Sequence, residues 1–251
     1  MPRDFVSRRE EAELRAEILN ARYEGWSAEA ILRDAILGGD VGPIALASSF
    51  GAESVVLLHM VAEIDRDVPV LFGQTQMLFQ ETLDYQRDVA AQLGLRDVRD
   101  VRPVPAVLAA QDPDTLLHQT DPDGCCALRK SAPMQSALAP FDAWITGRKR
   151  HQSATRAALK IVEVDAVGRL KINPLAEWTA AELNAYRIAH RLPAHPLVNK
   201  GFTSIGCAPC TTPVAPGEHP RAGRWRGQTK TECGIHVVDG KIEKAHRGPM
   251  D

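Results

Sequence analysis

Two short apolar segments, IALA at 44–47 and VPVLF at 68–72, are each followed by a helical pattern. Unbroken apolar runs of this length are typical of strands buried on both faces, and helices are expected from about Glu53 and over 79–93. The segments at 97–104 and 142–147 predict two further strands. Strands that alternate with helices predict an α/β fold with a mostly parallel sheet and helices on both faces.

Two other regions flank this pattern. Apolar residues recur at helical spacing in 8–22 and 27–37, whereas after Gly201 Pro and Gly accumulate and the periodicity ends. We therefore expect three parts: N-terminal helices (1–40), an α/β nucleotide-binding domain that includes the first cysteine pair (41–200), and a flexible C-terminal part with the second cysteine pair and a redox-active tail (201–251).

Charge and composition exclude some classes of partner. Among 251 residues 44% are hydrophobic and 25% charged, and the net charge is -2, so the whole chain offers no general attraction to nucleic acid or to a membrane. Apolar runs fall short of the roughly 20 residues that span a bilayer. The charged N-terminus does not resemble a signal peptide, which predicts a cytoplasmic protein whose cysteines stay reduced.

The segment SSFGAES (48–54) joins the first predicted strand to a helix. Backbone N–H groups at the start of that helix, with the hydroxyls of Ser48, Ser49 and Ser54, would suit a phosphate or another oxyanion. The segment matches neither a Walker loop nor a dinucleotide-binding glycine motif. A plain turn in which serine caps the helix is the alternative.

A basic segment, GRKRHQSATRAALK (147–160), follows the predicted strand at 142–147 and contains no acidic residue. Ligands of open α/β sheets lie beyond the carboxyl ends of the strands, so this segment and the serine-rich loop could face one crevice. We favour an anion site over a solvated charged face. Its cationic residues are Arg148, Lys149, Arg150, Arg156 and Lys160.

Four of the five cysteines form two tight pairs, Cys125–Cys126 and Cys207–x–x–Cys210. A single zinc ion usually takes cysteines about two to four residues apart. Adjacent cysteines can instead bind different irons of one cluster, so we favour a 4Fe-4S cluster over zinc, and both over unconnected buried residues. The fifth, Cys233 in KTECGIH, is then left as a candidate reactive thiol.

Six motifs in this order resemble one family: CCALRK, GRKRHQSATRA, INPLAEW, GFTSIGCAPCT, RAGRW and KTECGIH. They resemble assimilatory adenylyl-sulfate (APS) reductases, the cluster-containing branch of the phosphoadenylyl-sulfate reductase family, and the resemblance runs from about residue 42 to 237. The resemblance implies an adenine nucleotide α-hydrolase-like, Rossmann-like fold and the thiol-dependent reduction of APS to sulfite and AMP. The related 3′-phosphoadenylyl-sulfate (PAPS) reductases generally lack the cysteine pairs, so the pairs favour APS as substrate.

The resemblance also implies roles for single residues. Cys233 matches the nucleophile, which would form a thiosulfonate that thioredoxin or a similar dithiol resolves, and Lys130 matches a lysine between cluster and substrate. The other residues implied in substrate binding are Ser48, Ser49, Phe50, Gly51, Ser54, Arg156, Arg221 and Arg224. Where the family usually has Leu-Asp-Thr-Gly, this chain has Gln74 and Gln76 in place of Asp and Gly, which leaves open how the adenosine end is held.

The charges around Cys233 bear on its reactivity, because the thiolate is the attacking form. Lys230, Arg224 and Arg226 lie near it in the sequence and would favour ionisation, whereas Glu232 would oppose it if its side chain pointed inward.

Three other functions stay open. The first is PAPS reduction, which stays open because it uses the same terminal cysteine. A cluster-containing tRNA thiolase would need a different ATP loop, which Phe50 and Glu53 interrupt, and a larger basic surface. A zinc-stabilised binding module would leave Cys233 without a role. The chain could also form a homo-oligomer.

Overall fold

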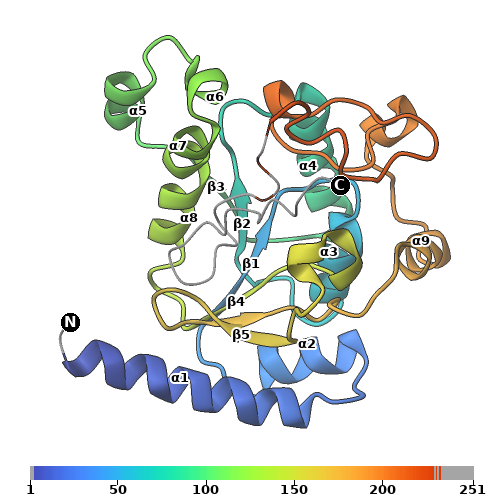
Figure 1. The fold of residues 1–251 in the computed structure, drawn as a ribbon. Coiled ribbons are helices and arrows are strands. Elements are labelled where there is room, and N and C mark those ends of the chain that lie inside the picture. The colour runs from blue at the N-terminus through green and yellow to red at the C-terminus, as the bar shows by residue number, and fades with distance from the viewer. Residues whose placement is uncertain (1–2, 229, 231, 233–251) are drawn as a thin grey trace, which may run out of the picture.

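A computed structural model describes residues 3–228, 230 and 232, and in this part of the chain six strands form one sheet in the order β3-β2-β1-β4-β6-β5 (Figure 1). All neighbouring pairs are parallel except β5 with β6. The predicted α/β fold with a mostly parallel sheet is confirmed. The strands are β1 Ile44–Ser48, β2 Val70–Gly73, β3 Val98–Val101, β4 Ala143–Ile145, β5 Val162–Val164 and β6 Leu170–Ile172.

Helices cover both faces of the sheet. Figure 1 shows α5 to α8 on one side, α3, α4 and α9 on the other, and α1 with α2 along the lower end. Ser27 caps α2 as the sequence predicts, since its hydroxyl accepts a hydrogen bond from Ala30 N at 3.2 Å. The helices are α1 Arg3–Arg22, α2 Ala28–Leu37, α3 Ser54–Ala62, α4 Gln80–Leu93, α5 Pro105–Gln111, α6 Leu117–Thr120, α7 Pro122–Cys126, the π-helix η1 Ala127–Ser131, α8 Ala132–Ala137 and α9 Ala180–Ala189.

The side chains of β1 divide between two apolar clusters, because successive residues of a strand point to opposite faces. Ile44 and Leu46 belong to the larger cluster, which includes the apolar residues of α2, α3 and α4. Ala45 belongs to a smaller cluster that contains Trp144 of β4 and Trp225 from the C-terminal part. The sheet is therefore buried on both faces, as its unbroken apolar strands predict.

The strand order reverses at β1, whose neighbours are β2 on one side and β4 on the other. Leu46 pairs with Val70 of β2 and with Ile145 of β4, so the three strands run side by side and end at the same edge. Loops that leave neighbouring strands at such a switch point diverge and open a crevice. The loops after β1 and β4 are the two segments that the sequence marks as anion-binding.

The part from 201 to 228 has little regular structure, and its buried residues are Ile205, Thr211, Gly223 and Trp225. A short 3-10 helix, η5 Ala208–Cys210, and isolated bridges such as Thr211 with Arg224 hold it together. Trp225 is only 4% exposed. This aromatic side chain packs in the smaller apolar cluster and anchors the segment, while the expected flexibility of the part from 201 onward stays a prediction. Cys233 and the rest of the expected tail lie outside the described residues.

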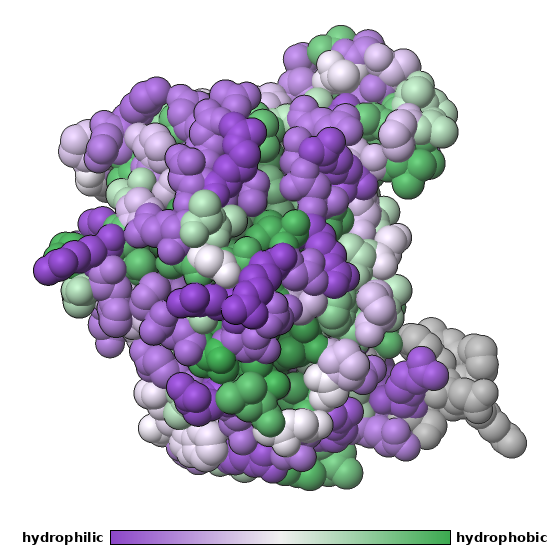
Figure 2. Space-filling model, turned by 180° about the vertical axis from the view of Figure 1, so that it is seen from behind, coloured by the Kyte–Doolittle hydropathy of each residue, from purple (hydrophilic) through white to green (hydrophobic). Residues whose placement is uncertain are grey.

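Apolar surface on the described part of the chain is scattered. Figure 2 shows hydrophilic and hydrophobic side chains interspersed on the face opposite to that of Figure 1. Large exposed hydrophobic residues come from several helices, among them Leu14 and Ile18 of α1, Leu37 of α2 and Ile188 of α9. Within the described ranges, every helix is too short or too polar to cross a bilayer.

Candidate active site

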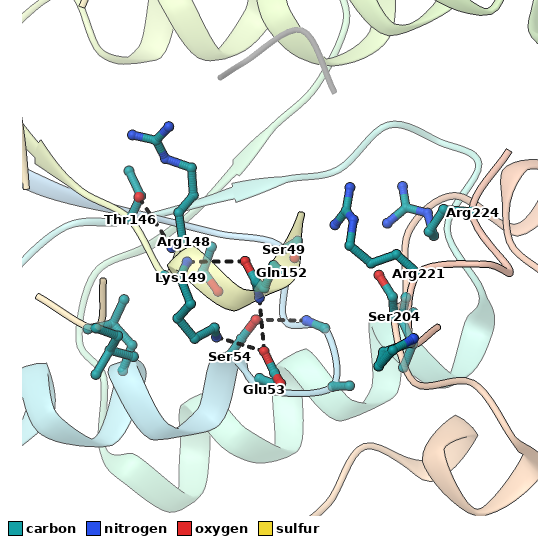
Figure 3. A pocket seen from close by; sticks show the side chains of 18 of the residues that line it. Ser49, Glu53, Ser54, Thr146, Arg148, Lys149, Gln152, Ser204, Arg221 and Arg224 are labelled. Carbon is teal, nitrogen blue, oxygen red and sulfur yellow. Dashed lines mark hydrogen bonds and ion pairs between the residues drawn. The ribbon is translucent and has the colours of Figure 1, made fainter. Parts of the chain in front are cut away.

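A cavity of about 250 Å³ lies beyond the carboxyl ends of β1 and β4. The loop after β1, the loop after β4 and the segment from Thr203 to Trp225 contribute to its wall, together with Lys130 and Glu232. Figure 3 shows Arg221 and Arg224 facing Ser49 and Lys149 across this space. The structure thus brings the serine-rich loop and the basic segment to one crevice.

The loop after β1 uses two of its hydroxyls to hold its own backbone. Ser48 Oγ accepts a hydrogen bond from Phe50 N at 3.1 Å, and Ser54 Oγ accepts one from Gly51 N at 3.0 Å. Phe50 is a non-glycine residue with a φ of 45°, and its buried ring packs edge-on against Phe72 with centroids 5.3 Å apart. Ser48 and Ser54 therefore shape the loop, whereas Ser49 is exposed and lines the cavity.

The first half of the basic segment is tied into the protein. Lys149 is buried, and its Nζ lies 2.7 Å from a carboxylate oxygen of Glu53, which also accepts a bond from Gln152 Nε2 at 3.0 Å. Burial lowers the pKa of Lys149, and the Glu53 charge partly offsets this. Burial raises the pKa of Glu53, but Lys149 and Gln152 outweigh it, so the net shift is downward. This pair fastens the loop after β4 to the start of α3.

Arg148 borders the cavity too, but it is buried and its side chain is held in a polar network. Its guanidinium pairs with Glu163 of β5 and lies 3.2 Å from Asn173 Oδ1. Asn173 in turn accepts a bond from Thr146 Oγ1 at 2.6 Å. Arg150, by contrast, forms an exposed ion pair with Glu177. Among the described ion pairs of this segment, that of Arg156 joins it to the C-terminal part, because its partner is Glu232.

Glu232 is held in the wall of the cavity by residues from two parts of the chain. Its carboxylate lies 2.8 Å from Arg156 Nη2 and 3.4 Å from Arg221 Nη2, and it accepts a bond from Ser153 Oγ at 3.0 Å. Burial raises the pKa of Glu232, but Arg156 and Arg221 outweigh it and lower the pKa below its ordinary value. The Glu232 side chain therefore does point inward, as an ionised carboxylate whose charge is balanced by Arg156 and Arg221.

The cations nearest to Cys233 in the sequence have other partners in the structure. Lys230 pairs with Asp123 at the start of α7, and Arg226 pairs with Glu218 at 3.0 Å. The guanidiniums that meet the residue before Cys233 come instead from Arg156 and Arg221. Cys233 itself lies outside the described residues, so the expectation that its sequence neighbours favour its ionisation stays a prediction.

Arg224 faces the cavity from above the ring of Trp225, with its Cζ 4.4 Å from the ring centroid. Its buried Nε has no hydrogen-bond partner among the described residues. Gly206 lies directly beneath the guanidinium, since a Cβ there would stand 2.3 Å from Arg224 Nη2. The close approach of backbone to side chain keeps this cation at the cavity wall.

The two cysteine pairs meet although they are far apart in the sequence. Cys126 and Cys210 pack against the same apolar cluster, and Cys207 Sγ lies 3.2 Å from Thr75 Oγ1. Burial raises the pKa of Cys125 to about 11, with Arg129 acting to lower it and the sulfurs of Cys207 and Cys210 to raise it further. None of these four cysteines forms a disulfide.

Lys130 follows the first pair on the π-helix η1 and lines the cavity. The role that the resemblance implies for Lys130, between a cluster and the substrate, stays a prediction. In the described part of the chain, no three His, Cys, Asp or Glu side chains converge in the way that a single metal ion requires. Four cysteine sulfurs are nevertheless the type of donor that an iron-sulfur cluster takes.

Sequence reasoning overlooked several residues of the site. In the sequence Glu53 is only a break in a loop pattern, and Gln152 and Ser153 carry no pattern that points to the site. Their roles come from contacts across the crevice, for which a single sequence carries no signal. Gln74 lies beside the site region, where its Oε1 accepts a bond from Gln76 N at 2.6 Å.

Residues 43–213 match the phosphoadenosine phosphosulfate reductase domain. The chain belongs to this family. Its relatives include an "adenosine 5′-phosphosulfate reductase" of Chelativorans sp., which is 51% identical over 90% of this chain and 93% of its own length. A "phosphoadenosine 5′-phosphosulfate reductase" of Gloeobacter violaceus is 43% identical over 88% of this chain and 93% of its own.

Among solved structures, the phosphoadenylyl-sulfate reductase of Candida auris in a phosphate complex has a TM-score of 0.67 with this chain at 28% identity. The match covers 78% of this chain and 96% of that one. The family resemblance drawn from the motifs is thus confirmed, and the phosphoadenosine phosphosulfate reductase fold accounts for the sheet order.

Proposed function

We propose that this chain catalyses the thiol-dependent reduction of APS to sulfite and AMP in assimilatory sulfate reduction. The Cys233 thiolate attacks the sulfuryl sulfur, an S–S bond forms as the S–O bond to the phosphate breaks, and AMP leaves with the electron pair. A dithiol such as thioredoxin then attacks Cys233 Sγ and releases sulfite. The second thiol of the dithiol resolves the mixed disulfide, so the dithiol supplies both electrons.

The observation that carries this proposal is one cavity lined both by the loop after β1 and by Lys130, Arg156, Arg221 and Arg224, with the residue before Cys233 in its wall. Arginine forks suit tetrahedral oxyanions and neutralise the charge that would repel a thiolate. Apolar residues of the same cavity, which suit an adenine ring, are Leu46, Leu57, Leu58 and Leu175. The names of several relatives point to the same reaction.

We assign substrate contacts to the residues that the resemblance implies, with one change. Ser49 has an exposed position toward the cavity and would contact the phosphosulfate directly. Ser48 and Ser54 already accept backbone N–H groups, so they act through the loop shape that also sets Phe50 and Gly51. Lys130 and the three arginines supply the positive charge.

A 4Fe-4S cluster held by Cys125, Cys126, Cys207 and Cys210 is part of the proposal. When bound, such a cluster supplies a charged group beside Lys130 and links α7 to the segment around η5. Because burial holds the pKa of Cys125 near 11, that thiol stays protonated at neutral pH unless a metal takes the place of the proton. Anaerobically purified protein is expected to absorb near 400 nm. A colourless protein that contains zinc would contradict this assignment.

The proposed partners are APS and a thioredoxin-like dithiol. We propose no nucleic-acid or membrane partner. Self-association into a homo-oligomer stays a prediction. The reaction requires thiols that remain reduced, which supports the cytoplasm as its location.

An assay of sulfite release from APS, with the full chain as enzyme and thioredoxin as reductant, tests the proposal. The Cys233→Ser variant should release none, and mass spectrometry of the wild type quenched without reductant should find a sulfonate adduct on the peptide that contains Cys233. Undiminished activity of the serine variant would refute the mechanism.

PAPS reduction is the second candidate, because one relative at 43% identity is named for that substrate. The same assay with PAPS separates the two. Turnover of PAPS equal to that of APS would overturn the assignment of APS as substrate.

A further inference from the structure

The carboxylate of Glu232 occupies the arginine pair to which the proposed function assigns a substrate anion. Arg156 and Arg221 approach the same oxygen, Oε2, from two different segments of the chain, and Ser153 Oγ bonds to the other oxygen. The Glu232 side chain retains only 20% of its exposure. A carboxylate held by two guanidiniums and a hydroxyl has the partners that a sulfate oxygen would use.

The other carboxylates near the basic side chains are directed elsewhere. Glu53 faces Lys149 and Gln152, and Glu163 faces Arg148. Among the described residues, Glu232 is therefore the carboxylate that pairs with Arg156 and Arg221 in the cavity wall. An incoming anion that binds these arginines would meet its negative charge.

The place of Glu232 in the chain links this contact to the reacting end of the substrate. The next residue is Cys233, which lies outside the described residues but must reach the sulfuryl sulfur for the proposed reaction. Adjacent residues are about 3.8 Å apart along the chain, so the anion nearest to Glu232 is the sulfate end of APS rather than its adenosine end.

We infer that Glu232 occupies the sulfate subsite in the ligand-free protein and that the sulfate of APS displaces it from Arg156 and Arg221. This inference rests on the proposed function. Displacement frees Glu232, the residue before the nucleophile, when the substrate binds. AMP has no sulfate and leaves Glu232 in place, which favours release of the product.

Binding of APS and AMP to full-length protein by isothermal titration calorimetry tests this inference. All variants carry Cys233→Ser so that APS stays intact. Adding Glu232→Gln removes the competing charge and should tighten APS binding about tenfold, while AMP binding changes less than twofold. Ser153→Ala removes only one bond to Glu232 and should tighten APS binding by a smaller factor.

Glu218→Gln is the matched control, because it removes the same charge from an exposed ion pair with Arg226 in the same part of the chain. It should leave both affinities within twofold. Unchanged or weaker APS binding by the Glu232→Gln variant would overturn the inference. Equal tightening for AMP would also overturn it, since the carboxylate would then occupy the phosphate end. If the parent Cys233→Ser protein binds no APS, the proposed function itself fails.

Discussion

The Glu53–Lys149 ion pair connects the loops after β1 and β4, and breaking it should destabilise the protein in a pH-dependent way. Lys149 is 3% exposed and Glu53 32% exposed. Removing one partner of a fully buried pair typically costs about 3–5 kcal/mol. Because Glu53 is partly solvated, Glu53→Gln should lower the free energy of unfolding by about 2–3 kcal/mol at pH 7.

Urea denaturation followed by circular dichroism measures this change. With an m value of about 3 kcal/mol/M for a chain of this size, the midpoint should fall by about 1 M. The double variant Glu53→Gln with Lys149→Met removes the isolated charge and should recover part of the loss, since an apolar replacement of both partners is better tolerated.

The direction in which stability changes with pH follows from the pKa of Lys149. Burial lowers the pKa of Lys149, and the Glu53→Gln variant lacks the carboxylate that offsets this shift. Between that lowered pKa and the unfolded value of about 10.4, the unfolded chain binds more protons than the folded one. Stability of the variant should therefore rise with pH more steeply than that of the wild type, and the gap should narrow toward pH 10.

A control and a clear contrary outcome complete this prediction. Glu177→Gln breaks the exposed ion pair with Arg150, which lies in the same loop as Lys149. It should change the free energy of unfolding by less than about 0.5 kcal/mol. A Glu53→Gln variant as stable as the control would refute the reasoning, as would a double variant less stable than the single one.

Two further predictions concern a buried lysine and a crowded glycine. Burial, with a contribution from Arg148, lowers the pKa of Lys171 to about 7, and its Nζ lies 4.7 Å from the centre of the Trp144 ring. Since the unfolded value is about 10.4, wild-type stability should gain from Lys171 as pH rises from 7 to 10, and Lys171→Met should remove that gain. Parallel stability curves for the two proteins would disagree with this. Gly206→Ala should force the Arg224 guanidinium away from a Cβ that would stand 2.3 Å from its Nη2. We expect APS affinity to fall several-fold with little loss of stability, and calorimetry showing unchanged affinity would contradict it.

The local pattern of apolar and polar residues was sufficient to predict the central strands and helices of the fold. The apolar run at 44–47 and the amphipathic stretch over 79–93 became β1 and α4 within a residue or two, because burial of a strand or of one helix face imposes a period on the sequence. The cavity was also foreseeable in outline, since parallel strands with diverging loops open a crevice at a known edge.

The sequence by itself determined the parallel α/β sheet, the two cysteine pairs, the odd Cys233 and the two segments expected to bind anions, since each is a matter of residue type and spacing. Only the tertiary structure decided that Lys149 binds Glu53 and that Glu232 meets Arg156 and Arg221. The physical reason is that ion pairs and packing contacts join side chains from distant segments. Their partners are chosen by where the folded backbone brings charges together, and no local period records that choice.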